Sequence, residues 1–327
     1  MSIQLKSEAQ SWPIAGRFTI ARGSKTEAQV LYVELRDGDH IGRGESVPYA
    51  RYGESIEASI AELEAIRTQV EAGLNIEALQ STLPAGAARN ALDCALWDLR
   101  AKQSGIAAFK TAGLRSLSPL KTAYTLSLDA PEAMGAQAAA NARRPILKLK
   151  IGGADDLDRV EAVRANAPKT RLIVDANEGL DFETLRRIAP DLKALGVVLI
   201  EQPLPVADDE ALMGYRSPVP LCADESLHTS ADLMRCARLY ECVNIKLDKT
   251  GGLTEALKLN QAARDKSLMV MVGCMVATSL SMAPAMIVAQ GADFVDLDGP
   301  LLLAKDREYG LGIVGSMLEP PLPELWG

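Results

Sequence analysis

Apolar and polar positions follow two different rhythms along this chain, and the rhythm changes near residue 121. Before that point, strand-like alternation at 17–35 and 40–46 is followed by helix-like spacing at 55–72 and 85–102. Strands and helices in separate runs are typical of an α+β arrangement. The first part of the chain is therefore predicted to be an α+β module.

From residue 119 onward, short apolar runs alternate with segments rich in Ala, Leu, Glu and Arg. Such alternation indicates βα units with a parallel sheet, and eight strands indicate a closed barrel. The predicted strands lie at 122–127, 146–151, 171–175, 197–201, 219–223, 242–247, 268–272 and 293–297. The tail at 304–327 is rich in Gly and Pro and should pack back on the first module. The predicted fold class is α/β, a modified TIM barrel, (β/α)₇β, at 119–303 with an α+β capping domain at 1–118.

The bulk composition narrows the range of partners. With 35 Lys and Arg against 43 Asp and Glu, the 327-residue chain carries a formal net charge of −8. An acidic chain without a basic block is not expected to bind nucleic acid, and its apolar stretches fall far short of the ~20 residues of a membrane span. Five cysteines without Cys-x-x-Cys spacing fit reduced thiols in a cytoplasmic protein. Because only two histidines exist, lysines and carboxylates must carry any acid–base chemistry.

Lysines stand at the ends of two predicted barrel strands. Side chains alternate across a strand, so Lys148 and Lys150 should both point into the barrel, where buried ammonium groups need anions or a ligand opposite them. Two adjacent ammonium groups should also lower one lysine pKa, as a general base requires. Lys246 ends a strand across the barrel, so two lysines could reach both faces of one bound carbon. The alternative for the first pair is a strand end that reaches solvent.

Asp175, Glu201 and Asp224 end the three consecutive strands between these lysines. Oxygen ligands alone suit a hard cation, and a site with positions left for substrate and water suits Mg²⁺. Each carboxylate taken singly could be a helix N-cap or a turn residue. Three in register favour a metal site.

Further charged residues could recognise a substrate. Asp296 and Asp298 are predicted to share one face of the last strand. Two carboxylates away from the metal side would suit a substrate ammonium group. The alternative for Asp298, which precedes Gly-Pro, is a turn residue. In the first module, Arg22 and Lys25 could bind a substrate carboxylate. A solvated surface role is the alternative for each.

Motifs spread over almost the whole chain resemble the enolase superfamily, and in particular its dipeptide epimerase branch. They include Arg51-Tyr-Gly-Glu-Ser, Asn244-Ile-Lys-Leu-Asp-Lys-Thr-Gly-Gly and Asp296-Leu-Asp-Gly. Enolase-superfamily sites pair a Lys or His base with Mg²⁺. The resemblance therefore implies a (β/α)₇β barrel with a capping domain and Mg²⁺ as cofactor.

The resemblance also implies a role for each candidate residue. Lys150 and Lys246 become the acid/base pair, with Lys148 as an electrostatic aide to Lys150. The three strand-end carboxylates become the Mg²⁺ ligands, and the two aspartates of the last strand hold the amino group of a dipeptide. The remaining candidate substrate contacts are Arg22 or Lys25 for a glutamate side chain, and Met275 and Val276 at the end of the seventh strand.

The implied reaction is the epimerisation of L-Ala-D-Glu to L-Ala-L-Glu by 1,1-proton transfer through an enediolate, with a role in murein peptide recycling. The alternatives are an epimerase of a different dipeptide, or another superfamily reaction such as o-succinylbenzoate synthesis or muconate cycloisomerisation. The substrates of those two reactions lack an ammonium group, which speaks against them. A non-catalytic ligand-binding barrel would give the opposed lysines no purpose. The resemblance also favours a homo-oligomer.

Overall fold

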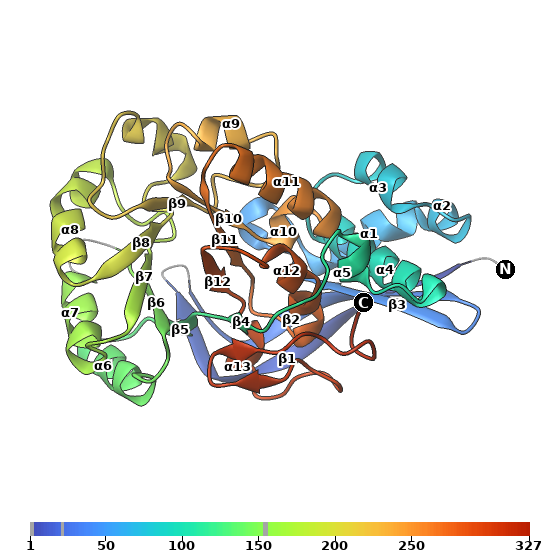
Figure 1. The fold of residues 1–327 in the computed structure, drawn as a ribbon, viewed down its shortest axis with the longest axis horizontal. Coiled ribbons are helices and arrows are strands. Elements are labelled where there is room, and N and C mark those ends of the chain that lie inside the picture. The colour runs from blue at the N-terminus through green and yellow to red at the C-terminus, as the bar shows by residue number, and fades with distance from the viewer. Residues whose placement is uncertain (1–2, 21–22, 153–155) are drawn as a thin grey trace.

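The computed structural model describes residues 3–20, 23–152 and 156–327, and the barrel lies beside a smaller sheet-and-helix cap (Figure 1). Eight parallel strands follow one another in chain order around the barrel. They are β5 (Tyr124–Leu126), β6 (Ile146–Lys150), β7 (Arg171–Asp175), β8 (Val197–Glu201), β9 (Leu221–Ala223), β10 (Cys242–Ile245), β11 (Met269–Gly273) and β12 (Phe294–Asp296). Between the first and last strands, the Ala123 N–H donates to Val295 O at 2.8 Å. The predicted TIM-like fold class is confirmed.

Helices follow these strands and cover the outside of the barrel (Figure 1). They are α6 (Pro131–Ala140), α7 (Leu157–Asn166), α8 (Phe182–Ala194), α9 (Leu233–Cys236), α10 (Leu247–Thr250), α11 (Leu253–Asp265), α12 (Ser279–Val288) and α13 (Gly299–Leu302). Local sequence sets their starts, as at α8, where the Asp181 side chain accepts a hydrogen bond from Thr184 N at 2.7 Å. Between β8 and β9 a 3₁₀ segment, Val206–Leu212, takes the place of an α-helix.

Strand alternation divides the barrel interior into layers. One apolar layer contains one buried side chain for each of the eight strands. They are Ala123, directly before β5, and Ile146, Ile173, Leu199, Cys222, Cys242, Met271 and Phe294 within β6 to β12. Two residues further along a strand, the side chain again points inward, one layer higher. That next layer is therefore made of the strand-end residues, and in this chain most of them are charged.

The cap combines an antiparallel sheet with five helices. The sheet contains β1 (Gln4–Ile20), β2 (Gly23–Asp37) and β3 (His40–Ser46), and the helices are α1 (Ile56–Ala65), α2 (Arg67–Glu71), α3 (Ile76–Thr82), α4 (Ala87–Ser104) and α5 (Ala108–Thr111). The predicted strand-like run at 17–35 covers the end of β1 and most of β2, which pair antiparallel. β1 begins thirteen residues before that run. The helix-like run at 55–72 is divided at Ile66, which ends α1 and precedes α2.

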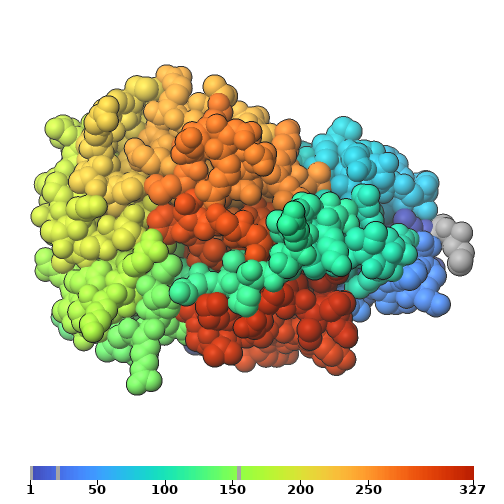
Figure 2. Space-filling model, in the orientation of Figure 1, coloured from blue at the N-terminus to red at the C-terminus, as the bar shows by residue number. Residues whose placement is uncertain are grey.

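The C-terminal tail lies against the cap. The Trp326 indole N–H donates to Cys94 O of α4 at 3.0 Å, and the Gly327 N–H donates to the Asp98 carboxylate at 2.7 Å. Figure 2 shows the red C-terminal segments beside the teal part of the chain. A small sheet of β4 (Leu120–Lys121), β13 (Ile313–Val314) and β14 (Met317–Leu318) joins the tail to the start of the barrel. Division of the chain at residues 118 and 303 stays a prediction.

In the described residues, no helix is both long enough and apolar enough to cross a bilayer.

Two glycines allow β3 to approach α4 closely. A Cβ atom added at Gly44 would overlap the carbonyl oxygen of Ala91, because no side chain separates the two backbones there. We expect Gly44→Ala to lower the free energy of unfolding by about 1–3 kcal/mol in urea denaturation. The control is Gly312→Ala, where the nearest neighbour would lie 3.4 Å away and the change should stay within about 0.5 kcal/mol. Equal unfolding midpoints for the two variants would contradict this packing.

Candidate active site

The charged layer brings eight of the candidate residues together at the carboxyl ends of the strands. All eight are buried: Lys148, Lys150, Asp175, Glu201, Asp224, Lys246, Asp296 and Asp298. In barrels of this kind, catalytic residues lie at this end. The layer therefore has the composition and the place of an active site.

Lys148 is the centre of the charged layer. Its ammonium nitrogen lies 3.0 Å from Asp175 Oδ2, 2.7 Å from Glu201 Oε2 and 2.8 Å from Asp296 Oδ2, so it forms ion pairs with three carboxylates and donates a hydrogen bond to Asp296. The neighbouring Lys150 lies 2.6 Å from Asp175 Oδ2. Both lysines thus point into the barrel, and neither is a strand end that reaches solvent.

Lys246 faces this pair from the other side. It follows β10, which is four strands away from β6 in the eight-stranded barrel. Its ammonium nitrogen lies 2.6 Å from Asp224 Oδ2 and 3.9 Å from Glu201 Oε1. Two cations therefore flank the carboxylates from opposite walls.

Carboxylates set the pKa values of Lys148 and Lys246. Burial alone lowers the pKa of Lys148, but the charges of Asp296, Glu201 and Asp175 outweigh it and hold that pKa well above its usual value. The sequence predicted a lowered pKa for one lysine of the pair, and Lys148 is not that lysine. Lys246 behaves alike, because Asp224 and Glu201 raise its pKa against the effect of burial. In this state both lysines are held as cations.

The three strand-end carboxylates are crowded. Burial and the charge of Asp175 raise the pKa of Glu201 to about 7, although Lys148 acts in the opposite direction. Burial also raises the pKa of Asp175, but Lys150 and Lys148 more than offset it and hold this pKa below its usual range. Buried oxygen donors that repel one another are the ligand type that a hard divalent cation takes, so the residue types fit Mg²⁺. As placed, the side chains of the described residues form no ready cluster of three such ligands.

Asp296, the last residue of β12, and Asp298, which directly precedes α13, form a second acidic pair. Asp298 Oδ2 accepts a hydrogen bond from Thr125 N at 2.6 Å. Its backbone also begins the turn into α13, where Asp298 O accepts from Leu301 N at 2.9 Å, but its side chain does not cap that helix. Burial and the neighbouring Asp296 raise the pKa of Asp298 to about 7. Asp296 Oδ1 is buried and makes no hydrogen bond with any residue that the structure describes. This pair has the capacity to hold a further cation.

The remaining candidates lie around the barrel mouth or outside the described chain. Arg22 belongs to the residues that the structure does not describe, and Lys25 is exposed on β2, opposite Phe18. Met275 and Val276 are partly buried after β11, and Val276 packs against a small apolar cluster shared with the cap. A contact of Arg22 or Lys25 with a substrate stays a prediction.

The cap meets the barrel mouth through Arg51 and Tyr52, which belong to a motif that carried the family resemblance but were assigned no role from the sequence. Arg51 makes a bidentate ion pair with Glu178, which follows β7, with distances of 2.9 and 2.8 Å. The Tyr52 ring stands edge-on to His228 with a centroid distance of 4.4 Å. Burial raises the pKa of Tyr52, and the Asp224 charge raises it further. Tyr52 therefore comes close to the charged layer from the cap.

Sequence reasoning also left two buried polar residues out of the site. Lys249 lies 2.6 Å from Asp224 Oδ1, and the Asn244 amide donates to Glu201 Oε1 at 2.7 Å. Both could have been found from spacing. Asn244 lies two residues before Lys246 on the strand side that faces inward, and Lys249 lies three residues after it at helical spacing.

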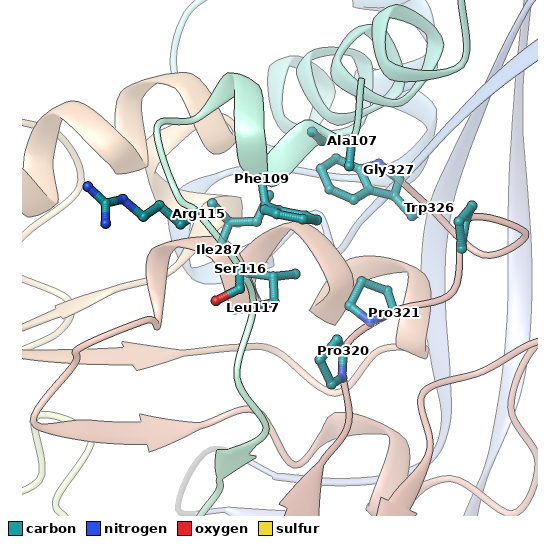
Figure 3. A pocket seen from close by; sticks show the side chains of 12 residues that line it. Ala107, Phe109, Arg115, Ser116, Leu117, Ile287, Pro320, Pro321, Trp326 and Gly327 are labelled. Atoms are coloured by element: carbon teal, nitrogen blue, oxygen red, sulfur yellow. The ribbon is translucent and has the colours of Figure 1, made fainter. Parts of the chain in front are cut away.

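An apolar hollow of about 290 Å³ lies elsewhere, between α5, residues 115–117 and the tail (Figure 3). Apart from Arg115 and Ser116, the residues that line it are apolar, and the Arg115 side chain points away from the hollow in Figure 3. It contains no acid–base pair, so we place the chemistry in the barrel.

Comparisons with known proteins agree with this placement. Residues 133–301 match the family model described as enolase C-terminal domain-like, and residues 2–112 match the N-terminal domain of mandelate racemase/muconate lactonizing enzyme. An N-acetyl-D-glutamate racemase from Pseudoalteromonas is 46% identical over 91% of this chain and 95% of its own. The L-Ala-D/L-Glu epimerase of Escherichia coli is 44% identical over 92% of this chain and 95% of its own.

Solved structures show the same relationship. An enolase family member from Agrobacterium tumefaciens, with bound sodium and L-Ala-L-Glu, superimposes with a TM-score of 0.98 at 51% identity over 99% of this chain and 100% of its own. A dipeptide epimerase from Methylococcus capsulatus, complexed with Mg and L-Arg-D-Lys, gives a TM-score of 0.91 at 30% identity over 100% of this chain and 99% of its own. With both family models matched and relatives at this level of identity, the chain belongs to the enolase superfamily, in its dipeptide epimerase branch.

Proposed function

We propose that this protein is an isomerase that interconverts L-Ala-D-Glu and L-Ala-L-Glu with Mg²⁺ as cofactor. The observation that carries the proposal is the pair of opposed buried lysines, Lys150 and Lys246, on either side of three crowded carboxylates. Two bases on opposite faces of one carbon allow a proton to leave on one side and return on the other. That is what inversion at the carbon α to a carboxylate requires.

Asp175, Glu201 and Asp224 would hold the metal. When bound there, Mg²⁺ supplies positive charge that stabilises the substrate carboxylate as it takes on enediolate character. Lys148 adds to this effect as a buried cation 2.7 Å from Glu201 Oε2 and 2.8 Å from Asp296 Oδ2. It is therefore an electrostatic aide, while Lys150 and Lys246 exchange protons with the substrate.

The state of Lys246 gives a reason for a metal requirement. Asp224 and Glu201 hold the pKa of Lys246 high, which favours its cationic form. A cation held by these two carboxylates would weaken this effect and make the Lys246 proton easier to lose. We expect the reaction to depend on the metal for this reason as well.

Metal removal should stop turnover and lower stability. With excess EDTA the epimerisation rate should fall to background, and Mg²⁺ should restore it. At a concentration 100 times the dissociation constant, Mg²⁺ should raise the free energy of unfolding by about 2.7 kcal/mol, measured by thermal or urea unfolding. The variant Asp175→Asn is the control and should gain much less. Full activity in EDTA would contradict a Mg²⁺ role.

The acidic pair on the last strand favours a substrate with a free amino group. Asp296 Oδ1 is buried without a hydrogen-bond partner in the described chain, and a substrate ammonium group would satisfy it. A dipeptide offers such a group, whereas an N-acylated amino acid does not. We therefore favour the dipeptide over the N-acetylated substrate named for one relative.

Substrate preference tests the proposal. The values of kcat/KM for L-Ala-D-Glu, N-acetyl-D-glutamate and a hydrophobic dipeptide should be compared by polarimetry with Mg²⁺ present. We expect L-Ala-D-Glu to lead, with a loss of about 10-fold or more for the substrate without an ammonium group. A higher value for N-acetyl-D-glutamate would replace the proposed substrate, and a higher value for the hydrophobic dipeptide would move it to another dipeptide class.

In the cell, we infer a role in the recycling of murein peptides, which contain this dipeptide. All five cysteines are free in the structure, which supports a reducing compartment, the cytoplasm. Assembly into a homo-oligomer stays a prediction.

A further inference from the structure

The three strand-end carboxylates share an arrangement in which one oxygen accepts a hydrogen bond from the protein scaffold and the other lies within 3 Å of a lysine at the barrel mouth. Asp175 Oδ1 accepts from Asn177 N at 3.0 Å, while Oδ2 faces Lys150. Glu201 Oε1 accepts from Asn244 Nδ2 at 2.7 Å, while Oε2 faces Lys148. Each carboxylate is thus oriented from behind.

Asp224 follows the same arrangement, but its scaffold partner is a charged side chain. The Lys249 ammonium lies 2.6 Å from Asp224 Oδ1, and Lys246 lies 2.6 Å from Oδ2. The Lys249 nitrogen also donates to Asp224 O at 2.5 Å and to Asn244 O at 3.0 Å. Its three donors therefore have three protein acceptors, and its side chain is fully buried.

Lys249 consequently differs from the other lysines of the site. Lys148, Lys150 and Lys246 reach oxygens that a cation or substrate would compete for, whereas Lys249 lies behind the carboxylate and is 0% exposed. It also holds the backbone of Asn244, whose side chain orients Glu201. Gly273 leaves room for Asn244, because a Cβ atom there would lie 2.7 Å from its side-chain oxygen.

On the basis of the proposed metal site, we propose that Lys249 is a positioning residue. Lys249 holds Asp224 Oδ1 and the backbone of Asn244, so that Asp224 and Glu201 each present one oxygen to the cation. The Gln202 side chain supports the same geometry by accepting from Asp224 N at 2.9 Å. Residues that orient metal ligands in this way typically change metal affinity 10–100-fold when replaced.

The direction in which Lys249→Met changes metal affinity distinguishes a positioning role from a role in charge balance. Removal of a cation beside a metal site makes the site more negative, so a role in charge balance alone predicts tighter metal binding in Lys249→Met. A role only in packing predicts unchanged binding. Loss of orientation predicts weaker binding.

The experiment is a Mn²⁺ titration followed by electron paramagnetic resonance on the full chain, after circular dichroism has shown that each variant is folded. We expect the dissociation constant of Lys249→Met to rise about 10–100-fold over that of the unmodified protein. The matched control is Lys102→Met, which removes a partly buried lysine paired with Asp98 in the cap at 2.8 Å and should leave the constant unchanged.

If Lys249→Met does not fold, Asn244→Leu serves as the second variant. This substitution changes no charge and should also weaken Mn²⁺ binding, because the Asn244 side chain orients Glu201. If the unmodified protein binds Mn²⁺ and the folded variants bind it equally or more tightly, the positioning role of Lys249 is wrong. Absence of Mn²⁺ binding to the unmodified protein would instead remove the proposed metal site itself.

Discussion

Lys246→Ala should lose epimerisation by a factor of about 10²–10⁴ while it keeps its fold. Lys246 and Lys150 stand on opposite walls of the barrel, and each is placed to serve one face of the substrate. Without Lys246, one face has no group to take or return a proton. The measurement is the rate of interconversion of L-Ala-D-Glu and L-Ala-L-Glu, with the fold checked by circular dichroism.

Proton exchange with solvent sharpens this prediction. In D₂O, Lys246→Ala should still exchange the α-proton of the diastereomer that Lys150 deprotonates, without forming the other diastereomer. Lys150→Ala should show the opposite selectivity. The control Lys121→Ala removes an exposed lysine on β4 and should behave like the unmodified protein. If either variant kept near-normal epimerisation, the two-base account would be wrong.

Asp296→Asn should reduce kcat/KM for the dipeptide about 10- to 100-fold. The substitution removes a charge that would pair with the substrate ammonium group, and hydrogen bonds to charged groups contribute about 1.5–3 kcal/mol. The substituted side chain keeps an oxygen that can accept from Lys148, whose present distance to Asp296 Oδ2 is 2.8 Å. The loss should therefore come mainly from the substrate contact.

N-acetyl-L-glutamate, which has no ammonium group, is the comparison substrate. Any general damage to Lys148 would reduce turnover of both substrates alike, whereas loss of an ammonium contact affects the dipeptide alone. We expect the ratio of the two kcat/KM values to move toward the N-acetylated substrate by the same 10- to 100-fold factor. Equal losses on both substrates would show that Asp296 does not bind the amino group.

Strand periodicity explains why so much of the barrel could be predicted. Because inward positions repeat every second residue, Ile146 in the apolar layer leads directly to Lys148 and Lys150 in the charged layer. The same rule leads from Ile173 to Asp175 and from Leu199 to Glu201. Register along parallel strands thus gave the fold class and the set of residues that meet at the barrel mouth.

Features that depend on tertiary contacts were not available from periodicity. The cap sheet begins at Gln4 because β1 pairs with β2 along most of its length, which no local signal indicates. Lys249 follows its strand, on a short helix, so strand alternation does not reach it. The raised pKa of Lys148 results from three carboxylates on other strands, and sequence reasoning expected anions opposite the lysines without knowing which carboxylates would lie within reach of Lys148.

The central claim is that one carbon loses and regains its proton between two lysines, and proton NMR in D₂O tests it most directly. L-Ala-L-Glu and, separately, L-Ala-D-Glu should be incubated with the protein and Mg²⁺. We predict that the glutamyl α-proton signal disappears from each sample while the other diastereomer forms. Absence of exchange with both dipeptides, in a protein shown to be folded and metal-bound, would contradict the account.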